Sequence, residues 1–119
     1  MNKNYKNYIL DYVKHESLCG NKTNCFKYYK NNTKEHEMVK FQVYMKLIDL
    51  GYDVLIEPEL KRNLGRPDIL AISKNRAIII EIMNTETIND MKDKFDKYPI
   101  DFEIEPINCK GFKIEEWGI

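Results

Sequence analysis

Cysteine and long apolar segments are scarce in this sequence, and each shortage excludes a class of protein. The 119 residues include three cysteines, an odd number that does not suit a disulfide-stabilised fold and favours reduced thiols. No apolar run approaches the roughly 18 residues that cross a bilayer. The first residues are polar and have no apolar signal segment behind them. We therefore expect a cytoplasmic, intracellular protein with no membrane partner.

An excess of charge of either sign is also absent. The chain has 19 Lys plus Arg and 19 Asp plus Glu, so its formal net charge is zero. That balance argues against a histone-like nucleic-acid binder. The charge is nevertheless uneven, because the net value is +5 over residues 1–46, −1 over residues 47–83 and −4 over residues 84–119. The basic first third could therefore still dock a polyanion.

The composition that remains is typical of one globular domain. Apolar residues make up 43% of the chain, aromatic residues 12% and charged residues 32%, which is enough to form a core. Within this domain we predict a helical N-terminal extension with a polar loop over residues 1–34 and an α/β core over residues 35–119. Tyr5, Ile9 and Tyr12 recur at helical spacing in the extension, and Gly20–Lys34 is expected to be a loop or short helix.

A long helix is predicted after Asn32 or Thr33, either of which can cap it. Glu35 and Glu37 fall in its first turn, where the helix dipole favours carboxylates, and Gly51 ends it. Two adjacent apolar seams predict burial over a wide face. The seams are Met38, Phe41, Met45 and Ile48, and Val39, Val43, Leu47 and Leu50.

The remainder of the chain alternates strand and turn signals. Ser73–Asn75 is short enough to join two antiparallel strands as a hairpin. The predicted elements are strands at Tyr52–Glu57, Arg66–Ile72 and Arg76–Met83, a polar helix from Thr85 or Thr87 to about Tyr98, and a strand at Phe102–Ile107. The order αβββαβ predicts an α/β fold with a mixed central sheet flanked by helices.

Two carboxylates stand out within the predicted hairpin. Asp68 follows Pro67 at the head of one strand, and Glu81 lies inside the apolar run of the next strand. A hairpin can bring both to one edge of the sheet, where burial of unpaired carboxylates is costly. A divalent cation such as Mg²⁺ removes that penalty and keeps waters for chemistry on a phosphate. This pair therefore favours metal-dependent phosphodiester cleavage.

The pattern resembles the PD-(D/E)xK nuclease superfamily, in particular its small Holliday-junction-resolvase-like, archaeal and viral members. The resemblance covers about residues 35–107 and lies in Pro67-Asp68, in Glu81-Ile82-Met83 and in a preceding helix with Glu37. It implies a restriction-endonuclease-like core and a Mg²⁺- or Mn²⁺-dependent deoxyribonuclease. Asp68 and Glu81 would be the metal ligands and Glu37 a third catalytic acid. The resemblance further implies DNA as substrate and a possible homodimer.

One position departs from the family pattern, because Met83 occupies the place of the motif lysine. Family members relocate or replace this lysine, and Lys40, one turn after Glu37, is the best candidate for the catalytic role here. His36 shares a helix face with Lys40. The remaining residues that could hold DNA or line the site are Lys61, Arg62, Arg66, Asn84 and Glu86.

The same residues permit two other interpretations. Met83 permits a catalytically inactive nuclease-fold module that binds DNA or a protein, and the basic helices permit a small regulatory partner of an acidic surface. The aromatic pair Tyr28 and Tyr29, beside Lys27 and Lys30, could stack on bases or pack in the core. A zinc site is not favoured, because the spacing of His15, Cys19 and Cys25 is irregular.

Overall fold

A four-stranded mixed sheet forms the centre of the computed structural model, which describes residues 3–14 and 23–119. Its strands are β1 (Asp53–Ile56), β2 (Ile69–Ile72), β3 (Ala77–Met83) and β4 (Glu103–Asn108), which lie side by side in that order. β1, β2 and β3 are antiparallel neighbours, and β4 runs parallel to β3. The predicted α/β class, mixed sheet and hairpin are therefore confirmed.

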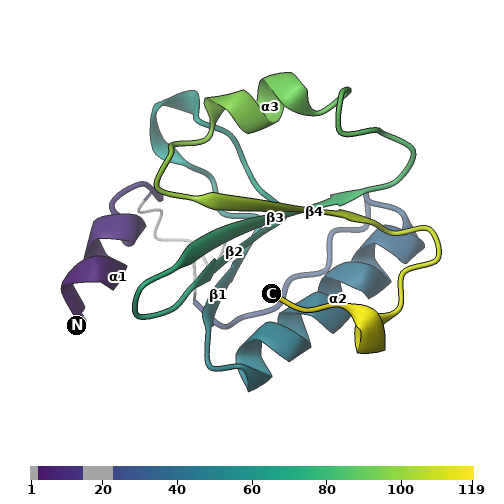
Figure 1. Cartoon of the computed structure of the whole chain (residues 1–119), viewed down its shortest axis with the longest axis horizontal. Helices are drawn as coiled ribbons and strands as arrows, with labels where there is room; N and C mark the ends of the chain where they lie inside the picture. Colours follow the sequence, from purple (N-terminus) through teal and green to yellow (C-terminus); the bar gives the residue numbers. More distant parts are fainter. Residues whose placement is uncertain (1–2, 15–22) are drawn as a thin grey trace.

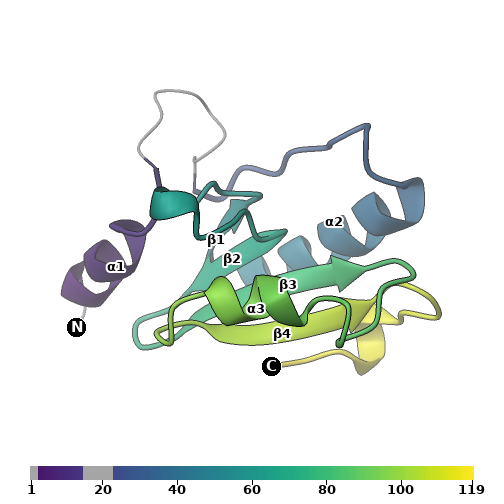
Figure 2. The same cartoon turned by 90° about the horizontal axis from the view of Figure 1, so that it is seen from above.

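Helices cover the two faces of this sheet (Figure 1). α2 (Lys34–Asp49) lies on one face, and α3 (Lys92–Lys97) lies on the other within the connection from β3 to β4. α1 (Lys3–Leu10) lies at the side of the sheet, away from α2, as Figure 2 also shows. Two 3₁₀ turns complete the described elements, η2 (Lys61–Asn63) before β2 and η3 (Ile114–Glu116) near the last residue.

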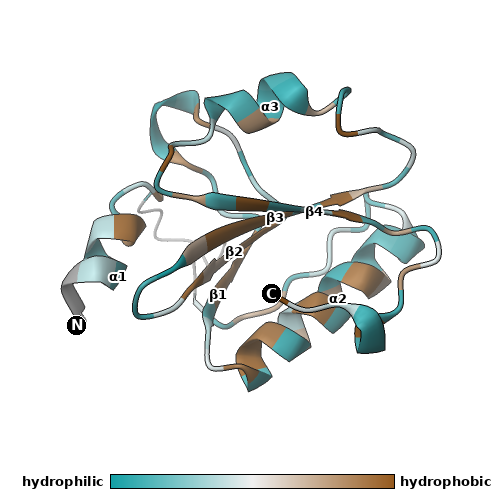
Figure 3. Ribbon diagram, viewed as in Figure 1, coloured by the Kyte–Doolittle hydropathy of each residue, from teal (hydrophilic) through white to brown (hydrophobic). Residues whose placement is uncertain are grey.

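Strand β3 separates two apolar cores. All seven of its residues are buried, and the ribbon is strongly hydrophobic along the strands in Figure 3. Because side chains alternate along a strand, Ile78, Ile80 and Ile82 enter the core beneath α2, whereas Ile79 enters the core that contains Tyr98. A charged residue in this strand, Glu81, must therefore find partners within the fold.

Helix α2 begins and ends as its sequence predicts. The Thr33 hydroxyl accepts a 3.1 Å hydrogen bond from the His36 amide, and Gly51 follows the helix with a φ of +91°. The predicted wide buried face is wrong, however. Val39, Val43 and Leu47 are buried, but the other seam is largely exposed, because a single sheet covers only one side of the helix. The exposed side chains are Met38, Phe41 and Met45 of that seam, together with Leu50 at the end of the buried one.

Helix α3 is shorter than predicted, because residues 85–87 are irregular and residues 88–91 form a turn. Thr87 and Asp90 satisfy one another there: the Thr87 amide donates to the Asp90 carboxylate, and the Asp90 amide donates to the Thr87 hydroxyl. This reciprocal pair is a capping box, as the predicted cap at Thr87 requires, and the Met91 amide donates to the Thr87 carbonyl in the turn that follows. Regular helix is confined to the residues after this turn, Lys92–Lys97.

The N-terminal extension contributes to the same globule. Ile9 and Val13 are buried in the core that contains Tyr98, and Val13 forms a β-bridge with Leu60. Residues 23–33 are irregular, which agrees with the predicted loop over its described part. No helix among residues 3–14 and 23–119 is long and apolar enough to cross a membrane.

Candidate active site at the end of strands β2 and β3

Three acidic residues lie on neighbouring strands at one edge of the sheet: Glu57 directly after β1, Asp68 directly before β2 and Glu81 near the end of β3. The pairing of Ile69 with Ile80 places the next residues along, Asp68 and Glu81, opposite each other. On the other side of β2, the Glu57 amide donates a 2.9 Å hydrogen bond to the Asp68 carbonyl and continues the register with β1. The hairpin thus brings together Asp68 and Glu81, as the sequence predicted, and adds Glu57.

Asp68 is held between the sheet and α2. One of its carboxylate oxygens, Oδ2, accepts a 2.7 Å hydrogen bond from the Ile82 amide of β3 and lies 3.4 Å from His36 Nε2. The side chain keeps 16% of its surface exposed. Asp68 is therefore fixed by β3 and α2 while remaining partly accessible.

Glu81 is almost completely buried, with 1% of its surface exposed. Burial and then the charge of Asp68 raise the pKa of Glu81 to about 7, against the opposing effects of Lys94 and Tyr98. The Asp68 and Glu81 carboxylates are thus close enough to repel one another. A positive charge between them would relieve that repulsion.

Helix α3 and the residue that ends it supply two partners for Glu81. Lys94 Nζ lies 3.2 Å from Glu81 Oε1, and the Tyr98 hydroxyl donates to Glu81 Oε2. Lys94 and Tyr98 are four residues apart and so project from the same side of the chain. The Lys94 side chain is 40% exposed, whereas Tyr98 is buried, and burial together with the charge of Glu81 raises its pKa.

A second ionic cluster lies beneath α2 and contains Lys40. The Lys40 side chain is completely buried, and its ammonium lies 2.9 Å from carboxylate oxygens of both Glu37 and Glu57. The same ammonium stands over the rings of Phe26 and Tyr29, at 5.5 and 4.7 Å from their centroids. Lys40 therefore balances two acids within an aromatic enclosure and has no exposed surface to offer a phosphate.

Glu37 receives further hydrogen bonds from the loop before α2. The Tyr29 amide donates to Glu37 Oε1 at 2.9 Å, and Asn32 Nδ2 donates to Oε2 at 2.8 Å. Burial opposes ionisation of Glu37, but these bonds and Lys40 outweigh it and lower the pKa of Glu37. The structure thus places Glu37 with Lys40 rather than with Glu81.

His36 connects the two clusters. Its Nδ1 lies 3.1 Å from Glu37 Oε2, and its Nε2 faces Asp68. Burial disfavours the charged imidazole, but the hydrogen bonds and charges of Asp68 and Glu37 outweigh burial and raise the pKa of His36. His36 is 5% exposed, so it positions Asp68 from within the fold.

The remaining predicted site residues are more dispersed. Met83 is buried, and Asn84 accepts hydrogen bonds from Thr33 and from the Cys109 thiol. Arg66 is 52% exposed and pairs with Glu59 at 3.7 Å. Three further candidates lie on the surface or at its edge, namely Lys61 and Arg62 in η2 and Glu86 after β3.

The aromatic and cysteine residues that the sequence singled out also differ in their surroundings. Tyr29 packs against the core beneath α2, whereas Tyr28 is 61% exposed. Cys25 is a free thiol, while His15 and Cys19 lie outside the described residues.

A divalent cation fits the acid pair on chemical grounds. Mg²⁺ is commonly held by one or two carboxylates together with waters and substrate phosphates, so Asp68 and Glu81 are a sufficient protein contribution. Within the described part of the chain there is no group of three or more His, Cys, Asp or Glu side chains arranged to hold a metal. A cation held by Asp68 and Glu81 would therefore take its remaining ligands from waters or from a substrate phosphate.

Comparisons with protein family models, with curated proteins and with solved structures find no match to this chain.

Sequence reasoning missed three members of the site, Glu57, Lys94 and Tyr98. Glu57 lies between the last residue of β1 and Pro58, and no pattern in the sequence indicates that its carboxylate pairs with Lys40. Lys94 and Tyr98 have i,i+4 spacing, which indicates a shared helix face, but only the connection from β3 to β4 shows that this face meets Glu81. The spacing thus indicates that Lys94 and Tyr98 lie together, but it does not indicate that they meet Glu81.

Proposed function

We propose that this protein is a Mg²⁺- or Mn²⁺-dependent deoxyribonuclease of the PD-(D/E)xK type with a restriction-endonuclease-like core. The observation that carries the proposal is the placement of Asp68 opposite Glu81 with the Lys94 ammonium 3.2 Å from Glu81. Two acids and one lysine near the end of a strand are the elements of an active site of the PD-(D/E)xK type. Here the lysine comes from α3 instead of the position of Met83.

Each residue then has a defined task. Asp68 and Glu81 would hold the cation, which when bound supplies a more acidic water and polarises the phosphate. Lys94 is partly exposed beside this pair, so its ammonium can orient a water or hold a phosphate oxygen. Tyr98 and His36 keep the two acids in place through hydrogen bonds. Lys40 has no part in this scheme, because Glu37 and Glu57 occupy it.

DNA would approach from the partly exposed side of this site. Lys94, with its side chain 40% exposed, and Arg66, 52% exposed, are cations that can neutralise phosphates there. Their positive charge offsets the net negative charge of residues 47–119. Binding is expected to weaken as salt rises, because displaced counterions drive such contacts.

The test is cleavage of supercoiled plasmid and of branched DNA with Mg²⁺ or Mn²⁺. Asp68→Asn and Glu81→Gln should each abolish cleavage, and Lys94→Met should slow it by about 10²-fold, the scale of one lost electrostatic or acid–base group. Lys74→Met is the matched control, because Lys74 is exposed in the turn at the opposite end of β3 and should leave the rate unchanged. Wild-type cleavage that survives Asp68→Asn or Glu81→Gln would overturn the site.

A binding measurement separates the nuclease from the inactive alternative. The buried Met83 favours that alternative, since no lysine enters the site from β3. Mn²⁺ should raise the melting temperature of the wild type but not of Asp68→Asn. If Mn²⁺ and DNA bind without cleavage, the protein is an inactive nuclease-fold module; if neither binds, a role as a protein partner is favoured.

A further inference from the structure

A stripe of apolar side chains lies exposed along the outer face of α2. Met38 is 66% exposed, Phe41 45% and Met45 46%. Single exposed apolar residues are ordinary on protein surfaces, but a contiguous stripe marks an interaction surface. The stripe lies on the side of α2 that faces away from the sheet, and nothing in the proposed cleavage chemistry uses it.

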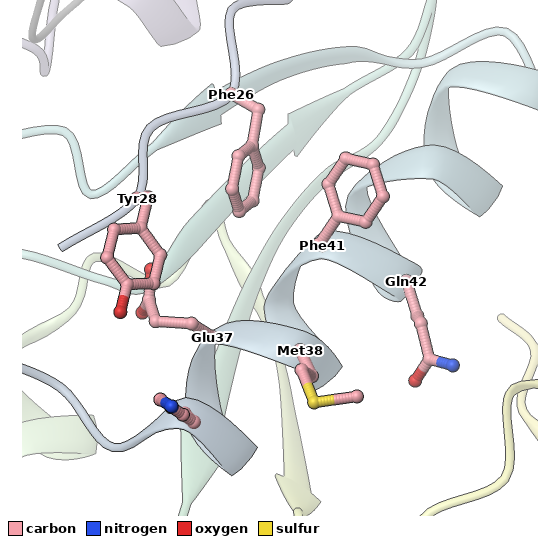
Figure 4. A pocket seen from close by; sticks show the side chains of 7 residues that line it. Phe26, Tyr28, Glu37, Met38, Phe41 and Gln42 are labelled. Atoms are coloured by element: carbon pink, nitrogen blue, oxygen red, sulfur yellow. The ribbon is translucent and has the colours of Figure 1, made fainter. Parts of the chain in front are cut away.

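The stripe forms the floor of a groove. Two hollows of about 600 and 490 Å³ lie next to one another along the helix, and Phe41 and Gln42 line both. Figure 4 shows Phe26 and Tyr28, from the segment before α2, beside the residues of the helix. The Phe26 and Phe41 rings meet edge to face with centroids 5.0 Å apart, which holds the wall against the floor. The second hollow is closed by Ile114 of η3.

The exposed charged side chains at the two ends of the groove have opposite sign. Lys34 lines the first hollow, whereas Asp49 and Glu115 line the second, and all three are exposed. The other charged residues of the lining are already engaged, Glu37 with Lys40 and Lys46 with the carbonyls of Ile114 and Trp117. Among the ion pairs of the described residues, none includes Lys34 or Asp49. A partner that fits this groove therefore needs an acidic group opposite Lys34, an apolar middle and a basic group opposite Asp49.

A second copy of α2 has that order of charges. The exposed residues of α2 that line the two hollows are at positions 34, 38, 41, 42, 45 and 49, and their spacing reads the same from either end. Two antiparallel copies centred between Phe41 and Gln42 bring Met38 opposite Met45 of the second copy. The same arrangement places Lys34 opposite Asp49. A surface that complements itself in this way is the requirement for a two-fold interface.

We propose that the outer face of α2 is the interface of a symmetric homodimer, with the two α2 helices antiparallel across a two-fold axis near Phe41 and Gln42. The apolar stripe supplies the buried centre, and the Lys34 and Asp49 pairs supply the rim and the direction of packing. The interface lies on the outer surface of the α2 layer, whereas Glu81 meets α3 on the opposite face of the sheet. The proposal therefore stands whether or not the protein cleaves DNA.

Sedimentation velocity tests the dimer directly. The wild type at about 100 μM should sediment with twice the 14.2 kDa mass of the chain. Phe41→Glu should weaken self-association by about 30-fold or more, as the loss of a central anchor does. Ile100→Glu is the matched control, because Ile100 is 99% exposed outside the groove and should leave the dimer intact. A monomeric wild type, or a dimer unaffected by Phe41→Glu, overturns the proposal.

Charge reversal tests the antiparallel register without altering the apolar floor. Lys34→Glu alone and Asp49→Lys alone should each weaken the homodimer by about tenfold, because both rim pairs become repulsive. A mixture of the two variants should restore association, since opposite charges then meet at both rim pairs: the two introduced side chains at one, and the unaltered Lys34 and Asp49 at the other. Lys74→Glu, outside the groove, should have no effect. Failure of the mixture to associate more tightly than either variant alone refutes this interface.

Discussion

Lys40 is buried completely, yet its ammonium has two carboxylates and two aromatic rings around it. Removal of one member of a buried ionic group leaves the others without compensation, which is more costly than loss of the pair itself. Lys40 therefore matters for the stability of the fold, and its contribution is measurable apart from any activity.

We expect Lys40→Met to lower the free energy of unfolding by about 3–5 kcal/mol, because Glu37 and Glu57 would then lie within the fold without a cation. Urea denaturation followed by circular dichroism measures the change. Lys74→Met serves as the exposed control and should shift stability by no more than about 0.5 kcal/mol. Equal stability of Lys40→Met and wild type would contradict the structural role of the cluster.

Glu81 predicts a dependence of stability on pH in the absence of metal. Its pKa is raised from 4.5 to about 7 in the folded protein, first by burial and then by Asp68. Between these values the folded state binds more protons than the unfolded state, so the free energy of unfolding falls as pH rises from 4.5 to about 7 and stays lowered above it.

Glu81→Gln removes this titration. Urea denaturation in EDTA measures the free energy of unfolding of the variant and of the wild type at about pH 5 and about pH 8, on either side of the raised pKa. Relative to the wild type, the variant should be more stable at about pH 8 than at about pH 5. Comparison at each pH cancels titration of groups elsewhere in the fold. The same difference at both pH values would mean that Glu81 titrates normally.

At the scale of elements, the start of α2 determines where His36 and Glu37 stand. The Thr33 hydroxyl accepts from the His36 amide and donates to the Asn84 side chain after β3. One side chain thus satisfies a free amide of the first helical turn and ties the helix to the strand that carries Glu81. The position of His36 against Asp68 depends on this helix start.

Thr33→Ala should reduce the free energy of unfolding by about 1 kcal/mol, because the first turn of α2 loses its cap. Thr33→Ser keeps the hydroxyl and should lose much less. Urea denaturation of the two variants gives the comparison. A loss as large in Thr33→Ser as in Thr33→Ala would show that the cap is not the cause.

Across the whole molecule, β3 joins the cores on the two faces of the sheet. Its side chains enter both cores. Loss of packing in one core therefore disturbs the strand on which the other core also packs. Trp117, the single tryptophan, packs against the core beneath α2. Its fluorescence therefore reports on one face, and circular dichroism reports on the entire fold.

We expect cooperative unfolding of the two cores together. Leu47→Ala beneath α2 and Leu70→Ala on the other face should each cost about 2–5 kcal/mol, as for other buried leucines. Because β3 couples the faces, each substitution should move the fluorescence and circular dichroism transitions to lower urea by the same amount. Leu70→Ala that shifts only the circular dichroism transition would show that the faces unfold separately.

Predictions from sequence were most accurate where local chemistry decides the structure. Alternation and apolar runs located every strand to within a few residues, and Ser73–Asn75 correctly indicated the hairpin. The opposition of Asp68 and Glu81 follows from that hairpin. The predicted extent of α3 was wrong: Thr87 and Asp90 form a capping box, but residues 88–91 form only a turn and regular helix begins at Lys92.

By itself, the sequence determined the α/β class, the order of the elements and the acid pair, since periodicity, turn residues and hairpin length act over short distances along the chain. Only the tertiary structure decided which lysine meets which acid. Lys40 is one turn from Glu37 in the helix and is enclosed with it, whereas Lys94 reaches Glu81 through the connection between parallel strands. The exposed seam of α2 was decided in the same way, because burial depends on which face the sheet covers.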